Sequence, residues 1–528
     1  MEAKEMETKE ENEKRKGSFD KTLVLVPVVL VALVSIWFLA DPSGSLSSLD
    51  NVANFFISKT GWFFLLFSVF MVGFSAWWAF GKYGKVRLGG ADAKPKFTMT
   101  SYILMLFSAG MAAGSLVFSM CEWMFYYTGP PFGIEPESLE AAEIALPYAF
   151  YNWGVGVAVL NMLLAIPYCY SYYIKKNPSL QLGDVAIGLL GTKKTYAAPL
   201  AKVINLIFII CVLGSLSCTL GLGIPNISKS IIAATGMSSQ YEMTISVIFI
   251  IVIAVIFSFS SYLGITKGFK KLVSINIVWA LIFLVLMLFS GNTMFILDNF
   301  VNSLGLMIQN YPTMAFNADA VFGYGFGQNW TVFFYCYAWG FVAMTAVVIV
   351  KISYGRTMRE MILGNVLGIN AGLWVMFGIN SGQGMALQLS GKLDVIAVFK
   401  ESGHHEAIIA VLKQGLLGPT FMVVAFVVMM VLFVSTTMDA ASLSLSGASS
   451  IGLKMNEDPN PFLRLLWCLV LTAIPLTFTF LGAGLNSLQS LVNLIGWPIM
   501  VIGIIVFLRT VKQAGIDKID KDEKLIAS

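Results

Sequence analysis

A cluster of oxygen-bearing side chains interrupts one of the most apolar stretches of the chain. Ser435, Thr436 and Thr437 are consecutive, and Asp439 follows within the same helical turn. Hard cations prefer oxygen ligands, so this streak could bind Na⁺. Hydroxyl groups in membrane helices also bond back to preceding carbonyl groups, which would give them a structural role alone. Three hydroxyl groups beside a carboxylate favour the cation site.

A second apolar stretch, residues 107–127, reads FSAGMAAGSLVFSMCEWMFYY. Gly110 and Gly114 bracket small residues there, which permits either close helix packing or a break in the helix. A broken helix exposes carbonyl groups that bind ions and solutes. Glu122 lies further along the same stretch. A carboxylate inside a membrane is costly and usually functional, whereas one near the interface can simply be solvated.

Aromatic side chains crowd residues 330–341, and Trp153 precedes Asn161 by about two helical turns in another stretch. Some of these rings must serve as interfacial anchors and core packing. Aromatic faces also bind cations, quaternary ammonium above all. The amide of Asn161 needs a partner if it is buried, either on a neighbouring helix or in a bound molecule.

The composition places these groups in a membrane. Hydrophobic residues make up 57% of the 528 residues and charged residues only 12%, against about 25% charged residues in soluble domains. This excludes a soluble enzyme, a disordered chain and a fibrous one. Apolar runs of about 20 residues predict transmembrane helices. We therefore expect an all-α integral membrane protein with about twelve transmembrane helices, near residues 22–40, 62–81, 98–127, 146–174, 200–232, 243–262, 272–290, 330–352, 360–382, 418–448, 462–482 and 489–509.

The basic residues predict how these helices are oriented. Twelve spans divide the 34 lysine and arginine residues into 29 on the side of both termini and five on the other. The positive-inside rule then places both termini in the cytoplasm of a multi-pass plasma-membrane protein. We expect cytoplasmic tails at 1–21 and 511–528, and an outer loop at 291–328 with a helix lying on the membrane interface.

Cysteine and histidine offer little metal chemistry. Six cysteines lie in apolar stretches without metal-ligand spacing, so we expect small buried hydrophobes. His404 and His405 are adjacent in the loop 383–417. Adjacent side chains on a helix point in different directions, so we expect an exposed loop there in preference to a metal site.

The whole chain resembles the betaine/choline/carnitine transporter family. The most specific match is WTVF at Trp330 followed by ISYGRTMRE, and TGPPFGIEPES after the third span is similar to the carnitine/butyrobetaine branch. The resemblance implies a LeuT-type fold of two five-helix inverted repeats, at 98–290 and 329–510, preceded by two peripheral helices within 22–97. It also implies homotrimers and a small zwitterionic substrate bound between spans 3, 4 and 8. No nucleic-acid partner or organic cofactor is expected.

The resemblance also implies a Na⁺ site between spans 3 and 10. The ion ligands would be carbonyl groups of the third span and carbonyl or hydroxyl groups of the tenth: Ser108, Met111, Phe433, Thr436 and Thr437. Sodium-independent carnitine exchangers carry an arginine where this chain has Asn276, and a methionine where it has Thr345. Both departures favour Na⁺ coupling. Ser215, Ser217 and Thr345 form a possible second ion or polar site.

The aromatic cage of the family is largely altered. Trp153 matches the first cage tryptophan, but the next two aromatic positions fall at Ala158 and Asn161, and the paired tryptophans at Tyr337 and Ala338. Other residues of the predicted substrate site are Trp339, Phe341, Gly110 and Gly114. Each lost cation–π contact weakens quaternary ammonium binding by about 2 kcal/mol when it is desolvated. The substrate would then be a betaine-class amine or a less methylated zwitterion such as glycine.

The sequence thus predicts Na⁺-coupled uptake of a small zwitterionic amine. The alternative within the same family is Na⁺-independent exchange of the carnitine/butyrobetaine type. A channel is disfavoured because nothing resembles a filter sequence, and a membrane enzyme because no histidine lies within a span.

Overall fold

The apolar stretches form helices in the computed structural model, which describes residues 18–526 apart from 111, 180, 264–267, 269, 455, 456 and 482–484. In chain order the α-helices are α2 (Lys21–Ala40), α3 (Pro42–Phe80), α4 (Met99–Gly110), α5 (Ala113–Thr128), α6 (Leu139–Asn152), α7 (Val155–Leu160), α8 (Met162–Cys169), α9 (Leu182–Leu190), α10 (Lys194–Thr235), α11 (Glu242–Leu263), α12 (Lys270–Leu288), α13 (Thr293–Gln309), α14 (Tyr311–Ala315), α15 (Phe333–Ile352), α16 (Met358–Leu389), α17 (Val395–Ser402), α18 (His404–Leu412), α19 (Pro419–Ser449), α20 (Pro461–Leu481) and α21 (Leu485–Ile516).

Ten helical segments in the described part of the chain are long and apolar enough to cross a membrane. The span predicted at 98–127 is divided into α4 and α5, each too short to cross alone. The span predicted at 462–482 corresponds to α20, which contributes a shorter apolar stretch, Pro461–Ala473. The prediction of an all-helical integral membrane protein is therefore confirmed, and the count of twelve spans stays a prediction.

Two spans are broken near their middle. Between α4 and α5, Ala112 has extended backbone (φ −130°, ψ 169°), and the Ser115 hydroxyl accepts a hydrogen bond from its amide. The second break follows α6, where Gly154 separates it from α7. A Cβ atom on Gly154 would overlap the carbonyl oxygen of Phe150, so this turn requires glycine. The first break confirms one of the two interpretations of the Gly110–Gly114 segment.

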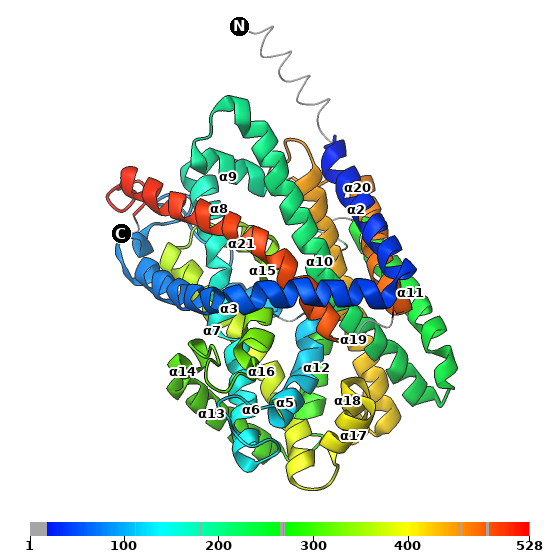
Figure 1. Ribbon diagram of the computed structural model, residues 1–528. Helices are drawn as coiled ribbons and strands as arrows, with labels where there is room; N and C mark the ends of the chain where they lie inside the picture. Colours follow the sequence, from blue (N-terminus) through cyan, green and yellow to red (C-terminus); the bar gives the residue numbers. More distant parts are fainter. Residues whose placement is uncertain are drawn as a thin grey trace, which may run out of the picture.

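The loops gather at two opposite ends of the helix bundle (Figure 1). The start of α2 and the C-terminal residues lie toward one end, whereas α13, α14, α17 and α18 lie at the other. This separation agrees with the predicted alternation of the loops. The loop 291–328 contains the predicted amphipathic helix, α13, which buries Ile296 and Met307 and exposes Leu297 and Val301.

At the end that carries the C-terminus, three distant segments pair through their backbones. The amides of Arg87 and Ala91 donate to the carbonyl oxygens of Leu525 and Lys524, at 2.6 and 2.7 Å. Residues 86–91 also pair on their other side with residues 355–358, which follow α15. The end of the chain is thus joined, through residues 86–91, to the loop between α15 and α16.

The expectation of an exposed loop at the two histidines is wrong. His404 and His405 form the first turn of α18 and are half-buried, because Ala407, Ile408 and Ile409 of the same helix turn into the core. The His404 ring lies 6.0 Å from that of Phe125 on α5. The histidines therefore cover the end of α5.

A buried ion pair joins three helices near the end that carries the C-terminus. The Arg464 guanidinium of α20 lies 2.6 Å from the Asp439 carboxylate of α19, and both side chains are almost fully buried. The hydroxyl groups of Ser260 and Ser261 on α11 also donate to this carboxylate. Asp439, noted in the sequence as a possible cation ligand, is therefore already neutralised by an arginine.

We predict that Asp439→Asn strongly destabilises the protein. The substitution leaves the Arg464 charge buried without a counter-charge, which costs about 3–5 kcal/mol. The measurement is the melting temperature of the purified protein in detergent. The control is Glu137→Gln, which breaks the exposed ion pair with Lys400 and should cost less than about 1 kcal/mol. Equal losses in the two variants would contradict the assignment.

The histidines of α18 predict a loss of stability at acid pH. Burial lowers the pKa of His404 to about 4 and that of His405 well below its usual range, while the Glu406 carboxylate opposes and Lys229 reinforces the effect on His404. The unfolded chain therefore binds more protons between pH 6.5 and 4, and stability falls as the pH falls through that window, by about 2 kcal/mol for a half-buried ring.

The measurement is the melting temperature between pH 7.5 and 4 for the wild type and for His404→Gln/His405→Gln. The double variant should show a flatter pH profile. An identical acid-induced loss in both proteins would show that other groups cause it.

Candidate functional site

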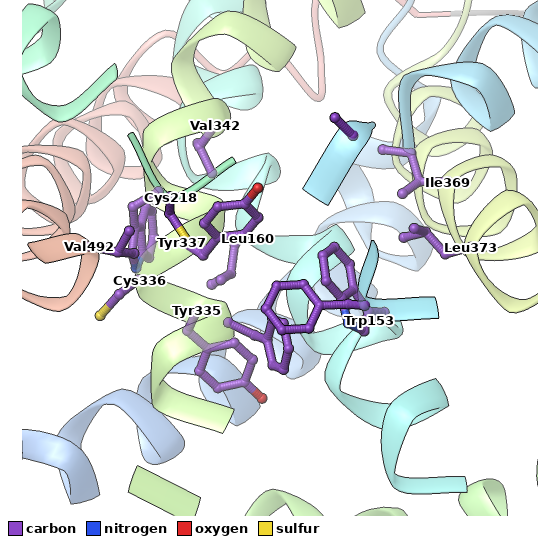
Figure 2. Packing of buried hydrophobic residues seen from close by; sticks show 14 of the residues in the cluster. Trp153, Leu160, Cys218, Tyr335, Cys336, Tyr337, Val342, Ile369, Leu373 and Val492 are labelled. Carbon is purple, nitrogen blue, oxygen red and sulfur yellow. The ribbon is translucent and has the colours of Figure 1, made fainter. Parts of the chain in front are cut away.

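Trp153, at the break between α6 and α7, is surrounded by aromatic rings. Its ring centroid lies 4.9 Å from Phe334, 5.4 Å from Phe377 and 5.9 Å from Phe118. The ring of Tyr337 lies 6.3 Å from that of Trp153, and the two side chains come from different elements, α15 and the break after α6 (Figure 2). Rings at these distances are in contact. We call Trp153, Phe118, Phe334, Tyr337 and Phe377 the aromatic cluster.

A buried carboxylate adjoins the aromatic cluster. Glu122 of α5 is fully buried, and its two oxygens accept hydrogen bonds from the Trp153 indole and the Tyr126 hydroxyl, both at 2.6 Å. The Asn152 amide donates to the same Tyr126 hydroxyl at 2.7 Å, and Thr331 donates to Asn152. No lysine, arginine or histidine of the described residues forms an ion pair with Glu122. The site therefore has an electrostatic preference for a cationic group.

The break in the third span leaves room for a tyrosine. The Tyr337 hydroxyl shares a hydrogen bond with Thr219 of α10 at 2.5 Å. A Cβ atom on Gly114 would overlap that hydroxyl group. Gly114 thus permits α15 to approach the start of α5, and Tyr337 connects both helices to α10.

The other residues of the predicted substrate site are divided between the aromatic cluster and its surroundings. Phe341 stacks edge-on against Tyr337 at 5.3 Å. Trp339 is instead buried against Phe67 of α3, at 6.1 Å. Ala338, between Tyr337 and Trp339 in the chain, is half-buried. Residues two apart on a helix point in nearly opposite directions, so Trp339 faces α3 while Tyr337 faces the aromatic cluster.

Tyr335 also lies away from the cluster. Its hydroxyl shares a hydrogen bond with that of Tyr151, and Figure 2 shows the hydroxyl groups of Tyr335 and Tyr337 pointing apart. Ala158 is buried, and its carbonyl oxygen accepts a hydrogen bond from Asn365 of α16. Asn161 joins α7 to α8 and is 8% exposed. Gly110 is the last residue of α4, next to the break, and its surroundings are not among those described.

The structure describes the part of the predicted ion site that α19 contributes. The hydroxyl groups of Thr436 and Thr437 both donate to the Phe433 carbonyl oxygen, at 3.0 and 2.8 Å. The Asn276 amide of α12 donates to Thr436 at 3.0 Å, and its carbonyl oxygen Oδ1 is buried without a hydrogen-bond partner. Of the other predicted ligands, Ser108 lies in α4 and would contribute its backbone carbonyl group. Met111 lies outside the described residues.

The oxygen atoms of these groups are suitable ligands for a sodium ion. Four oxygens from Phe433, Thr436, Thr437 and Asn276 share one region, and hydroxyl groups can turn to present lone pairs. The buried, unpartnered Oδ1 is an acceptor that a cation would satisfy. The uncharged side chain of Asn276 is visible in the sequence, but its hydrogen bond to Thr436 depends on how α12 packs against α19.

The second predicted ion or polar site, at Ser215, Ser217 and Thr345, stays a prediction. Ser217 donates to the Leu213 carbonyl of its own helix at 2.9 Å. Ser215 packs against Gly340 of α15, where a Cβ atom would overlap its hydroxyl group. Thr345 lies further along α15 and is half-buried. No contact described among these three residues joins them, and Ser215 serves close packing between α10 and α15.

Comparison with known proteins identifies the family of the chain. A family model described as BCCT, the betaine/carnitine/choline family transporter, matches residues 22–518. The chain belongs to this family. It is therefore a membrane transporter of small molecules and not an enzyme.

Two relatives are 30% and 31% identical to this transporter over the residues that align. One is a carnitine transporter of Acinetobacter baumannii (strain ATCC 19606), 31% identical over 438 residues, which cover 83% of this chain and 78% of the relative. The other is the uncharacterized transporter YeaV of Escherichia coli (strain K12), 30% identical over 446 residues, 84% of this chain and 91% of the relative.

Three rings of the aromatic cluster were missed by sequence reasoning. Phe118 and Phe377 belong to other helices, α5 and α16, and Phe334 is one of many aromatic residues within 330–341. A helical projection of α15 places Phe334, Tyr337 and Phe341 on one side. That projection could have identified Phe334 in place of Trp339.

The contact between Gly114 and Tyr337 predicts a rescue experiment. Gly114→Ala forces a methyl group against the tyrosine hydroxyl and should destabilise the protein by about 1–3 kcal/mol. Tyr337→Phe alone loses the hydrogen bond to Thr219, about 1 kcal/mol. The double variant should be more stable than the sum of the single effects predicts, measured as melting temperatures in a double-mutant cycle. Additive effects would contradict the close approach.

Proposed function

We propose that this transporter carries out Na⁺-coupled uptake of a small zwitterionic amine of the betaine, carnitine and choline class. The observation that carries the proposal is the combination of a desolvated aromatic cluster around Trp153 with the buried Glu122 carboxylate. Aromatic faces and a carboxylate both attract an ammonium group. The relative named a carnitine transporter supports the same substrate class.

The extra phenylalanines bear on the choice between methylated and unmethylated substrates. Phe118, Phe334 and Phe377 supply aromatic surface where the family pattern is lost at Ala158 and Asn161. A methylated ammonium group gains more from such rings than from hydrogen-bond acceptors, because it has few N–H groups to donate. We therefore favour a methylated amine over glycine.

The cage must open before it can take a ligand. The rings of the aromatic cluster are in mutual contact, and Trp153 is 7% exposed. A substrate would enter between α5, α7 and α15, displacing Tyr337 from Trp153. The indole of Trp153 would keep Glu122 oriented toward the ammonium group while the rings exclude water.

Ion coupling follows from the position of the ion donors. Phe433, Thr436, Thr437 and Asn276 would hold Na⁺, whose charge would draw α19 and α12 toward the break between α4 and α5. Gly114, the second residue of α5, lies next to the same break and contacts Tyr337 of the candidate substrate site. The ion and the substrate would thus favour the same arrangement of α5. The uncharged Asn276 favours this coupling over Na⁺-independent exchange.

The remaining family features are part of the same proposal. Two inverted repeats at 98–290 and 329–510 would move relative to each other, and three copies would assemble into a trimer. The broken helix α4–α5 supports the repeat, because discontinuous helices at mid-membrane are typical of such folds.

The substrate class is tested by uptake of labelled glycine betaine into proteoliposomes, with carnitine, choline and glycine as competitors and K⁺ replacing Na⁺ in parallel. We expect Na⁺-dependent uptake that methylated amines compete for more strongly than glycine. Glu122→Gln should weaken substrate binding about tenfold, since it removes the charged acceptor. Uptake of glycine with no competition by methylated amines would contradict the aromatic assignment.

The ion site is tested on the purified protein by its Na⁺-dependent thermal stabilisation. Asn276→Leu removes the free carbonyl oxygen and should raise the Na⁺ concentration for half-maximal stabilisation about tenfold. Asn276→Asp keeps an oxygen in place and serves as the matched control, with wild-type-like or stronger Na⁺ dependence. If Na⁺ does not stabilise the wild-type protein at all, Na⁺ coupling itself is contradicted. If Asn276→Leu has the same half-maximal Na⁺ concentration as the wild type, only the assignment of Asn276 to the site is contradicted.

A further inference from the structure

A cavity of about 310 Å³ lies between α10, α11 and α18, away from the aromatic cluster. This volume is at the lower end of the roughly 300–1,000 Å³ of small-molecule sites. None of its residues belongs to the aromatic cluster or to the predicted ion site. Its lining combines apolar walls with charged groups: Lys229, Ile232, Ala233, Ser239, Glu242, Glu406, Ile409, Ala410 and Lys413.

The four charged side chains of the cavity are arranged as one pair and two single charges. Lys229 of α10 lies 2.6 Å from Glu406 of α18 and joins the two walls. The second oxygen of Glu406 is buried without a hydrogen-bond partner. In the part of the chain that is described, neither Glu242 nor Lys413 forms an ion pair. One unpaired anion and one unpaired cation therefore line the same hollow from α11 and from the end of α18.

We propose that this cavity binds a zwitterionic group, with its ammonium end at Glu242 and its anionic end at Lys413. Such a group neutralises both single charges, which a simple anion or cation cannot do. The aliphatic side chains of Ile232 and Ile409 accommodate the short carbon chain between the two ends. The proposal does not depend on the transported substrate or on Na⁺ coupling.

Two sources could supply this chemistry: the ammonium–phosphate headgroup of phosphatidylethanolamine, or a dissolved zwitterion of similar size. The turn between α10 and α11 lies at the edge of the molecule (Figure 1). Tyr241, the residue before α11, is exposed. Along α11 the exposed apolar side chains include Ile248, Ile251 and Val255. Exposed apolar side chains on a peripheral helix would contact acyl chains, and an exposed tyrosine at a helix end is typical of the headgroup level. These features favour the lipid.

The test is the rate of acetylation of Lys413 by a water-soluble amine reagent, read by mass spectrometry on the full-length protein. The protein is placed in nanodiscs of phosphatidylethanolamine or of phosphatidylglycerol, and exposed Lys392 is the internal control. We expect Lys413 to react about fivefold more slowly in phosphatidylethanolamine, as for a site occupied most of the time, with Lys392 unchanged. Glu242→Gln should abolish the difference.

A third sample distinguishes the sources. Free phosphoethanolamine is added to nanodiscs that contain phosphatidylglycerol alone. Protection of Lys413 there, lost in Glu242→Gln, supports the zwitterion site with a dissolved occupant, and its absence beside protection by the lipid supports the lipid. Equal protection by both lipids, persistence of protection in Glu242→Gln, or no protection in any sample would overturn the proposal.

Discussion

The hydrogen bond between the Trp153 indole and the Glu122 carboxylate is the interaction on which the candidate site depends. Inside a membrane, a carboxylate must be satisfied by the protein, because neither water nor lipid tails can do it. Glu122 meets this requirement with donors from its own helix and from the break after α6. The same bond fixes the orientation of the indole ring, and therefore where the other rings of the cluster can pack.

The two helix breaks allow these side chains to meet. An unbroken α6–α7 helix would continue past Trp153 with its backbone groups paired, and an unbroken α4–α5 helix would place a regular turn where Tyr337 now approaches Gly114. Each break costs backbone hydrogen bonds, which local groups such as the Ser115 hydroxyl partly replace. Irregular backbone at this depth is tolerated where protein surrounds it.

The helices and the first break could be predicted from apolar runs and from small residues around Gly110. The second break could not, because a tryptophan followed by glycine gives no strong signal inside an apolar stretch. The resemblance singled out Trp153 and Tyr337, and the structure brings their rings together. It could not show that Trp339 packs on Phe67 while Phe118 and Phe377 come from other helices. Such contacts depend on how helices are rotated against one another, which spacing along one helix does not determine. The histidines were misjudged for a related reason, since an apolar face on a short loop helix indicates burial only once its neighbours are known.

The pairing of residues 86–91 with the last residues of the chain has a consequence for biosynthesis. These residues leave the ribosome long before Leu525 and Lys524, whose carbonyl oxygens accept hydrogen bonds from the amides of Arg87 and Ala91. Until then one edge of this segment remains open to other partners, as unpaired backbone edges are. Residues 355–358, which bond its other edge, emerge earlier. This pairing therefore cannot be completed until residues 524 and 525 have emerged, and a nascent chain arrested before that point would present an unfinished edge to the quality-control machinery.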